Sequence, residues 1–485
     1  MTKELILILD FGSPYTQLLA QKIRENHVFS RVVAHNISVK EIELQKPKGI
    51  ILSGCAESVY SKKDLLPEKG IFKLNIPILG ICYGARVIVQ HFGGRVKSDK
   101  SLKSDRCELF IDNSRNLFWQ MPGNITCWMN YADCVKRLPS NFKASAHTQE
   151  NPFSAFECVS KKIYGVSFQP EAVATQRGSQ IVGNFLYKIC GCLGTWTMKL
   201  FIRETVASIR KTVGKSKVIL SLNSSLNSFV LAILVNRAIG KRLKCIFIDN
   251  GLLRLNEAKQ IKKILNSNFH LNLNFIDKSQ RFLQGLKGVQ DCDDKKGIIR
   301  NISAELFQGV LKKSKGTQYL AQETLYSDVI NSGPVTDKPL KLKLLEPLCN
   351  LFKDEIRVIA KEFDLPDTLI FRQPFPQNGL AGRIIGEVTA SRLNLLREAD
   401  ACVVEEIKAA DIYEQIWQSF AVLILPKNVI AIRCVASISG TTADWVRLPY
   451  DVLEKIALRI TRKVKGVNRV VYDISSKPPT AIEWE

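Results

Sequence analysis

The stretch that organises this chain is residues 76–96, which read IPILGICYGARVIVQHFGGRV. A short apolar run, residues 76–81, leads to Cys82, which stands between Gly80 and Gly84. Apolar residues at helical spacing follow it. The pattern predicts a strand, a tight turn and a helix, with the cysteine at the turn.

A cysteine in that position has two interpretations. At a sharp strand-to-helix turn its sulfur projects into a cleft, and small neighbours leave room around it. The N-terminus of the following helix lowers a thiol pKa and offers backbone N–H groups to an oxyanion, which suits a nucleophile. The alternative is a buried structural cysteine in a parallel sheet, because free cysteines are among the most often buried residues.

Length and composition indicate an ordinary globular chain. Its 485 residues are enough for two or three domains, and it is 46% hydrophobic and 24% charged. No apolar run approaches a membrane span, and the N-terminal apolar stretch is too short for a signal peptide, so we expect no membrane partner. The 13 cysteines are scattered, and Cys190 and Cys192 stand too close together for the usual metal knuckle. We therefore expect reduced thiols in a cytoplasmic protein, and no metal site.

The net charge of +23 is large. Nucleic-acid binding, anionic small substrates and a genome-wide drift toward lysine could each produce it. Because the basic residues are spread along the chain, without a long Lys/Arg block or interleaved aromatics, the pattern disfavours nucleic acid. A phosphate-handling enzyme needs only local positive charge, so function does not explain the excess.

Two α/β regions follow one another along the chain. In the first, short β-branched runs alternate with helical patterns and predict a largely parallel sheet; the runs are residues 5–9, 50–52, 78–81 and 164–168. The glycine-containing segment CGCLGTW closes this region near Trp196.

The second region reads as the opening of a doubly wound nucleotide-binding fold. Its predicted order is helix 199–213, strand 217–222, polar turn 223–228, helix 229–239 and strand 245–248. Because ligands bind at the carboxyl ends of such strands, a pyrophosphate would lie at the polar turn. From about Arg372 the pattern changes again, to mixed helices and strands.

Several stretches carry a family resemblance. GICYG at 80–84 resembles the nucleophile elbow of class I glutamine amidotransferases. LILDFGSPYTQLLAQKIRE, GIILSGCAESVY and the C-terminal RVVYDISSKPPTAIEWE resemble one group of them, the glutamine-hydrolysing GMP synthases. The resemblance runs nearly end to end.

The resemblance implies three domains and one overall reaction. Residues 1–196 would be the class I glutamine amidotransferase domain, 197–371 the ATP pyrophosphatase (PP-loop) domain and 372–485 an α+β C-terminal dimerisation domain. The expected protein is a cytoplasmic homodimer that converts xanthosine monophosphate (XMP), ATP and glutamine to GMP, with Mg²⁺.

In the amidotransferase part, the resemblance makes Cys82 the nucleophile that attacks the glutamine amide and releases ammonia. The thiol needs an imidazole base and a carboxylate that orients it. The family's F-H-P-E reads Phe168-Gln169-Pro170-Glu171 here, so Glu171 is retained and Gln169 replaces the histidine. A glutamine cannot exchange protons near neutral pH. A second departure is Asn130-Tyr131-Ala132-Asp133, where the family has S-H-G-D.

In the synthetase part, the family's PP-loop reads S-G-G-x-D-S. Its glycines let backbone N–H groups approach the ATP pyrophosphate, while its hydroxyls and aspartate handle phosphate and magnesium. Here the loop is Asn223-Ser224-Ser225-Leu226-Asn227-Ser228, so both glycines have gained side chains and the aspartate is neutral. Serines can still bind anions, and in isolation the turn would pass as an ordinary polar loop.

Three further segments complete the comparison. Asp249 and Arg254 lie in DNGLLR, which resembles the family's adenine and ribose side, and Glu323 stands where the family has glycine. Residues 465–485 are nearly unaltered, and the resemblance carries Lys477, Ile482 and Glu483 over as XMP-binding residues. Core packing and a dimer interface would also account for that retention. Segments near 333 and 429–433 are shorter than in the family.

Two hypotheses follow. The first is a GMP synthase family protein whose activity is impaired at the glutaminase histidine and at the PP-loop. The second is a catalytically inactive homologue that binds a nucleotide or pairs with an active synthase subunit. Since the substitutions fall on chemical groups and spare the apolar core, both hypotheses predict an intact fold.

Overall fold

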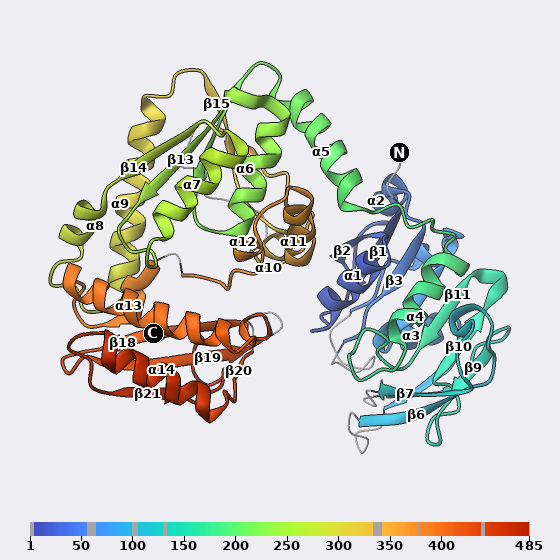
Figure 1. Ribbon diagram of the computed structural model, residues 1–485. Coiled ribbons are helices and arrows are strands. Elements are labelled where there is room, and N and C mark those ends of the chain that lie inside the picture. The colour runs from blue at the N-terminus through green and yellow to red at the C-terminus, as the bar shows by residue number, and fades with distance from the viewer. Residues whose placement is uncertain are drawn as a thin grey trace. The chain divides into compact units, whose positions relative to one another are not determined.

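The computed structural model describes residues 4–55, 65–98, 105–129, 133–332, 342–376, 378–437 and 442–484. The chain divides into two compact units, residues 1–201 and 202–485 (Figure 1). We call them the first and second units. The predicted three-domain division, with boundaries after residues 196 and 371, stays a prediction.

The first unit is built on one nine-stranded sheet (Figure 1). Its order is β2-β1-β3-β4-β11-β10-β9-β6-β7. The strands are β1 Leu5–Asp10, β2 Phe29–Ala34, β3 Gly49–Leu52, β4 Ile78–Ile81, β6 Asp105–Ile111, β7 Asn124–Met129, β9 Lys143–His147, β10 Ala155–Cys158 and β11 Ile163–Val166, while β5 Arg95–Ser98 and β8 Asp133–Arg137 pair separately. The helices are α1 Thr16–Glu25, α2 Val39–Gln45, α3 Tyr83–His91 and α4 Gly178–Asn184.

The α/β class is confirmed, but the expectation of a largely parallel sheet is wrong. Strands β2 to β11 pair in parallel, whereas β11, β10, β9, β6 and β7 pair antiparallel. The connection from β10 to β11 is residues 159–162, which is too short for the crossover that parallel pairing needs. The run expected at 164–168 is β11, which begins one residue earlier, at Ile163, and ends two residues earlier, at Val166.

The predicted strand, turn and helix at Cys82 are confirmed. Strand β4 is fully buried between β3 and β11, and α3 begins directly after the cysteine. A Cβ atom on Gly84 would lie 2.3 Å from the backbone oxygen of Leu52, and one on Gly80 would lie 2.6 Å from the nitrogen of Ala85. The glycines are therefore required because helix and sheet backbones touch here.

The second unit opens with a parallel five-stranded sheet in the order β14-β13-β12-β15-β16. These strands are β12 Lys217–Leu222, β13 Leu243–Asp249, β14 Leu273–Asp277, β15 Thr317–Ala321 and β16 Lys343–Leu345. The helices before and around them are α5 Met198–Val213, α6 Leu226–Ile239, α7 Glu257–Phe269, α8 Ser279–Gly285, α9 Cys292–Lys312, α10 Tyr326–Ser332, α11 Lys353–Glu362 and α12 Asp367–Ile370. The predicted doubly wound arrangement is confirmed.

The helix after the polar turn begins earlier than expected. It starts at Leu226 and not at residue 229, because the Ser225 side chain accepts a hydrogen bond from the backbone N–H of Ser228 and caps it. Only residues 223–225 are therefore turn, and Asn227 lies in the first helical turn.

A second sheet occupies the C-terminal part of this unit. It contains β17 Ile384–Ile385, β18 Gln418–Ile424, β19 Val429–Ala436, β20 Asp444–Trp445 and β21 Val470–Asp473. Helices α13 Ala390–Ala409 and α14 Tyr450–Lys463 pack with it around a large apolar core (Figure 1).

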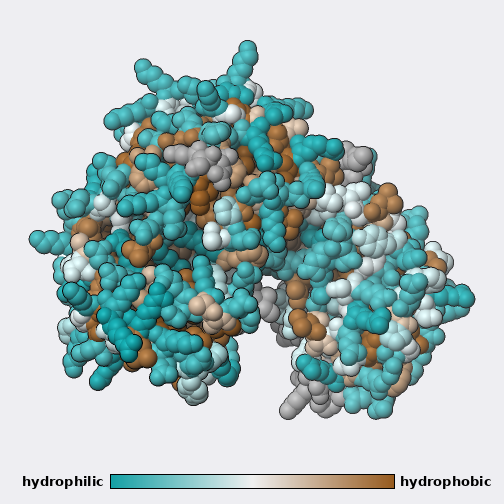
Figure 2. Space-filling model, in the orientation of Figure 1, coloured by the Kyte–Doolittle hydropathy of each residue, from teal (hydrophilic) through white to brown (hydrophobic). Residues whose placement is uncertain are grey.

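The surface is mostly polar. Hydrophilic residues cover most of the face in Figure 2, with hydrophobic residues scattered among them. In the described parts of the chain, no helix is both long and apolar enough to cross a membrane.

The close packing at the elbow gives a first testable expectation. Gly84→Ala places a methyl group against the backbone of Leu52, which cannot rotate away. We therefore expect the free energy of unfolding of the first unit to fall by about 3 kcal/mol or more. Gly123→Ala is the matched control, because a Cβ there meets nothing within 4 Å. Hydrogen exchange on peptides of the first unit measures both. Equal exchange in the two variants would contradict the packing argument.

Candidate functional site

Cys82 sits in a strained and buried elbow. Its backbone has φ 48° and ψ −104°, a conformation that L-residues rarely adopt and that costs about 1–3 kcal/mol. Its N–H donates to the Val166 oxygen at 2.8 Å, and its sulfur lies 3.4 Å from the Ser167 oxygen. The thiol is 1% exposed. The elbow is thus fixed by contacts with the strand beside it.

Burial raises the pKa of Cys82 to about 12. The Arg86 guanidinium lowers this pKa, and the Glu171 carboxylate raises it. The thiol pKa is therefore raised by burial and not lowered, in contrast to the expectation from the helix N-terminus. Near neutral pH the thiol is protonated and needs a base.

The segment after β11 does not supply that base. The Gln169 backbone N–H donates to the Trp128 oxygen at 3.0 Å, and its side chain is buried. Its Oε1 atom has no hydrogen-bond partner among the described residues. A buried amide oxygen without a partner is unusual, and an amide cannot take a proton from a thiol.

Glu171 is equally buried, and burial raises its pKa to about 7. Its Oε2 atom also lacks a hydrogen-bond partner in the described ranges. The segment 130–133 also departs from the family pattern, and its residues 130–132 lie outside the described residues. Asp133 begins β8 and forms an ion pair with the buried Arg86, 3.9 Å apart. Sequence reasoning missed Arg86, although it lies one helical turn after Cys82.

In the second unit, the PP-loop region is held by contacts within the protein. Asn223 Nδ2 donates to one carboxylate oxygen of Glu323 at 2.5 Å, and Ser225 Oγ donates to the other at 2.6 Å. The Ser224 carbonyl accepts a hydrogen bond from Arg372 at 3.0 Å. Ser228 is buried and its hydroxyl accepts from the Asn223 N–H at 3.2 Å.

A cavity of about 430 Å³ opens at this loop. Its lining includes five residues of the loop, but not Ser228, together with a carboxylate, cations and apolar side chains from β13 and from later in the chain. These lining residues are Asn223, Ser224, Ser225, Leu226, Asn227, Phe247, Asn250, Leu253, Glu323, Lys353, Arg357, Arg372, Phe375 and Gly379. The place predicted for a pyrophosphate, at the carboxyl end of β12, therefore opens into a cavity.

In this arrangement the loop is poorly prepared to hold a pyrophosphate. The side-chain donors of Asn223 and Ser225 are already engaged by the Glu323 carboxylate, which would repel a phosphate. Asn227 offers no negative charge for Mg²⁺. Within the described ranges, no cluster of three or more His, Cys, Asp or Glu side chains is placed to hold a metal ion.

Asp249 and Arg254 do not line that cavity. Asp249 accepts the Gly251 N–H at 2.9 Å in the turn after β13, and burial raises its pKa. Arg254 lines a neighbouring cavity of about 610 Å³ and pairs with Asp400, with Nε 3.1 Å from Oδ2. From this segment, Asn250 and Leu253 line the cavity at the loop.

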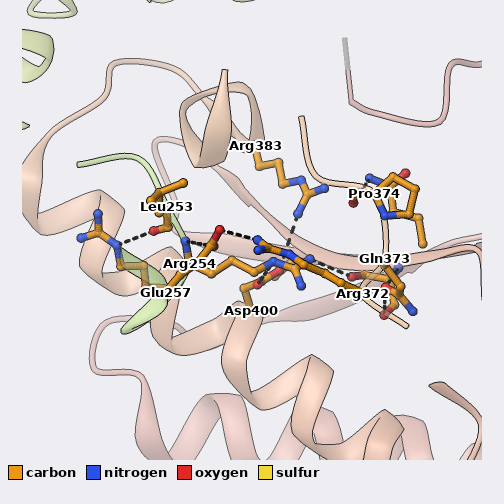
Figure 3. Close-up of polar contacts among 12 residues, drawn as sticks. Leu253, Arg254, Glu257, Arg372, Gln373, Pro374, Arg383 and Asp400 are labelled. Atoms are coloured by element: carbon orange, nitrogen blue, oxygen red, sulfur yellow. Dashed lines mark hydrogen bonds and ion pairs between the residues drawn. The ribbon is translucent and has the colours of Figure 1, made fainter. Parts of the chain in front are cut away.

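Buried charges connect the walls of the two cavities. Arg254 and Arg383 converge on Asp400, and Arg372 pairs with Glu257 (Figure 3). Sequence reasoning missed Asp400, although a charged residue on the apolar face of a helix was a usable signal.

The C-terminal tail is anchored by two buried arginines. Arg383 donates to both oxygens of Glu483, each at 3.0 Å. Arg433 donates to the Ile482 carbonyl at 2.7 Å. Lys477 exchanges two backbone hydrogen bonds with Ala443. The fold thus orders all three tail residues, and their role toward XMP stays a prediction.

The cysteine elbow and the mixed sheet lie in a region that matches one known class of protein. The family model for class-I glutamine amidotransferases matches residues 7–189, and the model for the GMP synthase C terminal domain matches residues 405–484. The chain thus combines an amidotransferase domain with the C-terminal domain of one particular amidotransferase group.

Full-length relatives identify that group. The GMP synthase (glutamine-hydrolyzing) of Bacillus cytotoxicus is 42% identical over 505 residues, covering 99% of both chains. Those of Bacillus licheniformis and Bacillus cereus strain G9842 are 42% and 41% identical, over 100% and 99% of this chain and 99% of their own lengths. This chain belongs to the glutamine-hydrolysing GMP synthase family.

The prediction that Gln169 leaves Cys82 without a base can be tested by placing a histidine at position 169. Gln169→His should raise the rate at which iodoacetamide alkylates Cys82 at pH 7.5 by at least tenfold, because an imidazole stabilises the thiolate. The modified peptide is quantified by mass spectrometry. Gln149→His, on the exposed surface, is the control and should leave the rate unchanged. An unchanged rate in Gln169→His would mean that residue 169 does not act on the thiol.

The buried carboxyl of Glu171 predicts a pH-dependent stability. The folded protein protonates it below about pH 7, while the unfolded chain does so only below about pH 4.3, so ionisation destabilises the fold as pH rises between these values. Glu171→Gln should therefore stabilise the first unit by about 3 kcal/mol at pH 8 and by about 1 kcal/mol at pH 5.

Hydrogen exchange on first-unit peptides at the two pH values measures the difference. Glu150→Gln, in an exposed position of the same unit, is the control and should have no effect at either pH. A gain that is equal at pH 5 and pH 8 would show that charge burial is not its cause.

Proposed function

We propose that this chain catalyses the GMP synthase reaction, amination of XMP at the expense of ATP and glutamine, at a strongly reduced rate. Full-length similarity to GMP synthases supports the reaction class over a purely binding role. The observation that carries the reduced rate is the unpartnered amide oxygen of Gln169, which stands where the family has its base, in a unit whose Cys82 thiol has a pKa of about 12.

The two half-reactions are affected for different reasons. Glutamine hydrolysis loses proton transfer, and removal of such a base typically costs several orders of magnitude in rate. XMP activation is hindered because the loop donors bind Glu323. The amination chemistry itself needs the tail, and its contacts to Arg383 and Arg433 are in place.

The substrates and setting follow the family. Glutamine would bind at Cys82, ATP with Mg²⁺ at the cavity beside Asn223–Ser228, and XMP near Lys477, Ile482 and Glu483. The protein would act as a cytoplasmic homodimer, without nucleic acid or membrane as partner. The second unit as a whole would contain both the ATP pyrophosphatase and the dimerisation domains.

The deciding experiment is GMP formation by the full-length protein from XMP and Mg-ATP, with glutamine or with ammonium as nitrogen source. We expect product with ammonium at a low rate and at least 100-fold less with glutamine, because only the glutamine route needs the missing base. Gln169→His should raise the glutamine rate and leave the ammonium rate unchanged. Equal rates with both nitrogen sources in the unmodified protein would contradict the role of Gln169.

No product with either source, from a folded protein, would overturn the proposed reaction. It would favour the second hypothesis, an inactive homologue that binds a nucleotide or an active partner subunit. Folding is checked in the same preparation by thermal unfolding.

A further inference from the structure

Glu323 reaches the PP-loop from the neighbouring strand. It follows β15, which pairs in parallel with β12, so its side chain and the loop share one edge of the sheet. Its carboxylate accepts hydrogen bonds from Asn223 Nδ2 at 2.5 Å and from Ser225 Oγ at 2.6 Å. An anion has thus been built into a loop that would otherwise offer these donors to a ligand.

The two contacts fix the form of the loop. Asn223 Oδ1 accepts the Ser225 N–H at 2.7 Å, and Ser225 Oγ also accepts the Ser228 N–H at 3.0 Å. Each side chain therefore donates to Glu323 and accepts from the loop backbone. Because the amide nitrogen of Asn223 can only donate, the Glu323 oxygen that it meets accepts this hydrogen bond.

The rest of the cavity still suits an anion with a flat apolar part. Lys353, Arg357 and Arg372 line it together with the Glu323 carboxylate, and of these cations Arg357 lies 3.5 Å from Asp354 and Arg372 pairs with Glu257. Phe247 and Phe375 supply aromatic surface. Burial raises the pKa of Glu323, and its hydrogen bonds from Ser225 and Asn223 lower it. One phosphate can bind the cations, whereas a chain of phosphates that reaches the loop meets a negative charge.

We propose that Glu323 is a specificity-determining residue: by taking the hydrogen bonds of the PP-loop, it makes this cavity select a nucleoside monophosphate over a nucleoside triphosphate. This inference rests on the proposed function, because that function makes this cavity the nucleotide-binding pocket. It concerns binding, and turnover plays no part in its test.

The test is isothermal titration calorimetry of the full-length protein with AMP and with ATP, each with and without Mg²⁺. We expect AMP to bind at least tenfold more tightly than ATP. In Glu323→Gly the ATP affinity should rise at least tenfold, because Asn223 and Ser225 are released, while the AMP affinity changes less than threefold. Glu323→Gln keeps the shape but removes the charge, and should give a smaller gain in the same direction.

Glu305→Gln is the matched control. It removes the same charge from the same unit, in an exposed ion pair with Arg281, and should leave both affinities unchanged. Thermal unfolding verifies that each variant is folded. If Glu323→Gly alone fails to fold, the comparison of Glu323→Gln with Glu305→Gln still decides.

The outcomes separate this inference from the proposed reaction. ATP that binds the unmodified protein as tightly as AMP, or an affinity ratio that neither Glu323 variant changes, would overturn it. Absence of binding by both nucleotides would overturn it as well. Preferential AMP binding that reverses in Glu323→Gly would support this inference, whether or not the protein forms GMP. Absence of GMP formation would overturn only the proposed reaction.

Discussion

The carboxylate of Asp400, held between Arg254 and Arg383, is the interaction on which the second unit depends. All three are largely buried, and Asp400 also accepts the backbone N–H of Ala421 on β18. Removal of one partner from such a group leaves an uncompensated buried charge, at a cost of about 3–5 kcal/mol. Since Arg383 also binds Glu483, this one carboxylate joins α13, the second sheet, the wall of a cavity and the C-terminal tail. The unaltered tail sequence therefore has a packing explanation beside a ligand-binding one.

The first unit depends in a similar way on backbone contact between β3, β4 and α3. The strained conformation of Cys82 follows from that contact and from the two glycines that permit it. It does not depend on a base at position 169. The geometry of the elbow is thus set by backbone contacts alone, and by itself it says little about rate.

The sequence predicted what local pattern controls and missed what distant contacts control. Strands β1, β3, β4 and β12 and the elbow were predicted, because apolar runs bounded by glycine or polar turns are local signals. The antiparallel half of the first sheet depends on connection lengths. The pKa of the Cys82 thiol depends on its burial, which cannot be predicted from the neighbouring residues in the sequence. The contact between Glu323 and Asn223 joins residues 100 positions apart, so the substitution at 323 was visible but its partner was not.

The two sites that depart from the family pattern, residue 169 and the loop 223–228, differ in physical kind. This difference decides which substitutions could restore the family's chemistry at each. On our proposal position 169 lacks a group: the thiol and the Glu171 carboxylate are present, and one side chain would supply the proton acceptor. The PP-loop has gained one: Glu323 fills it, and its donors are satisfied. A lost group leaves unsatisfied atoms such as Gln169 Oε1, which keep a cost in the folded state. A filled loop leaves none, so the closed arrangement is stable in its own right. Restoration of a glycine at 224 alone would therefore leave both contacts with Glu323 in place, whereas a glycine at 225 would remove the Ser225 hydroxyl and with it one of the two.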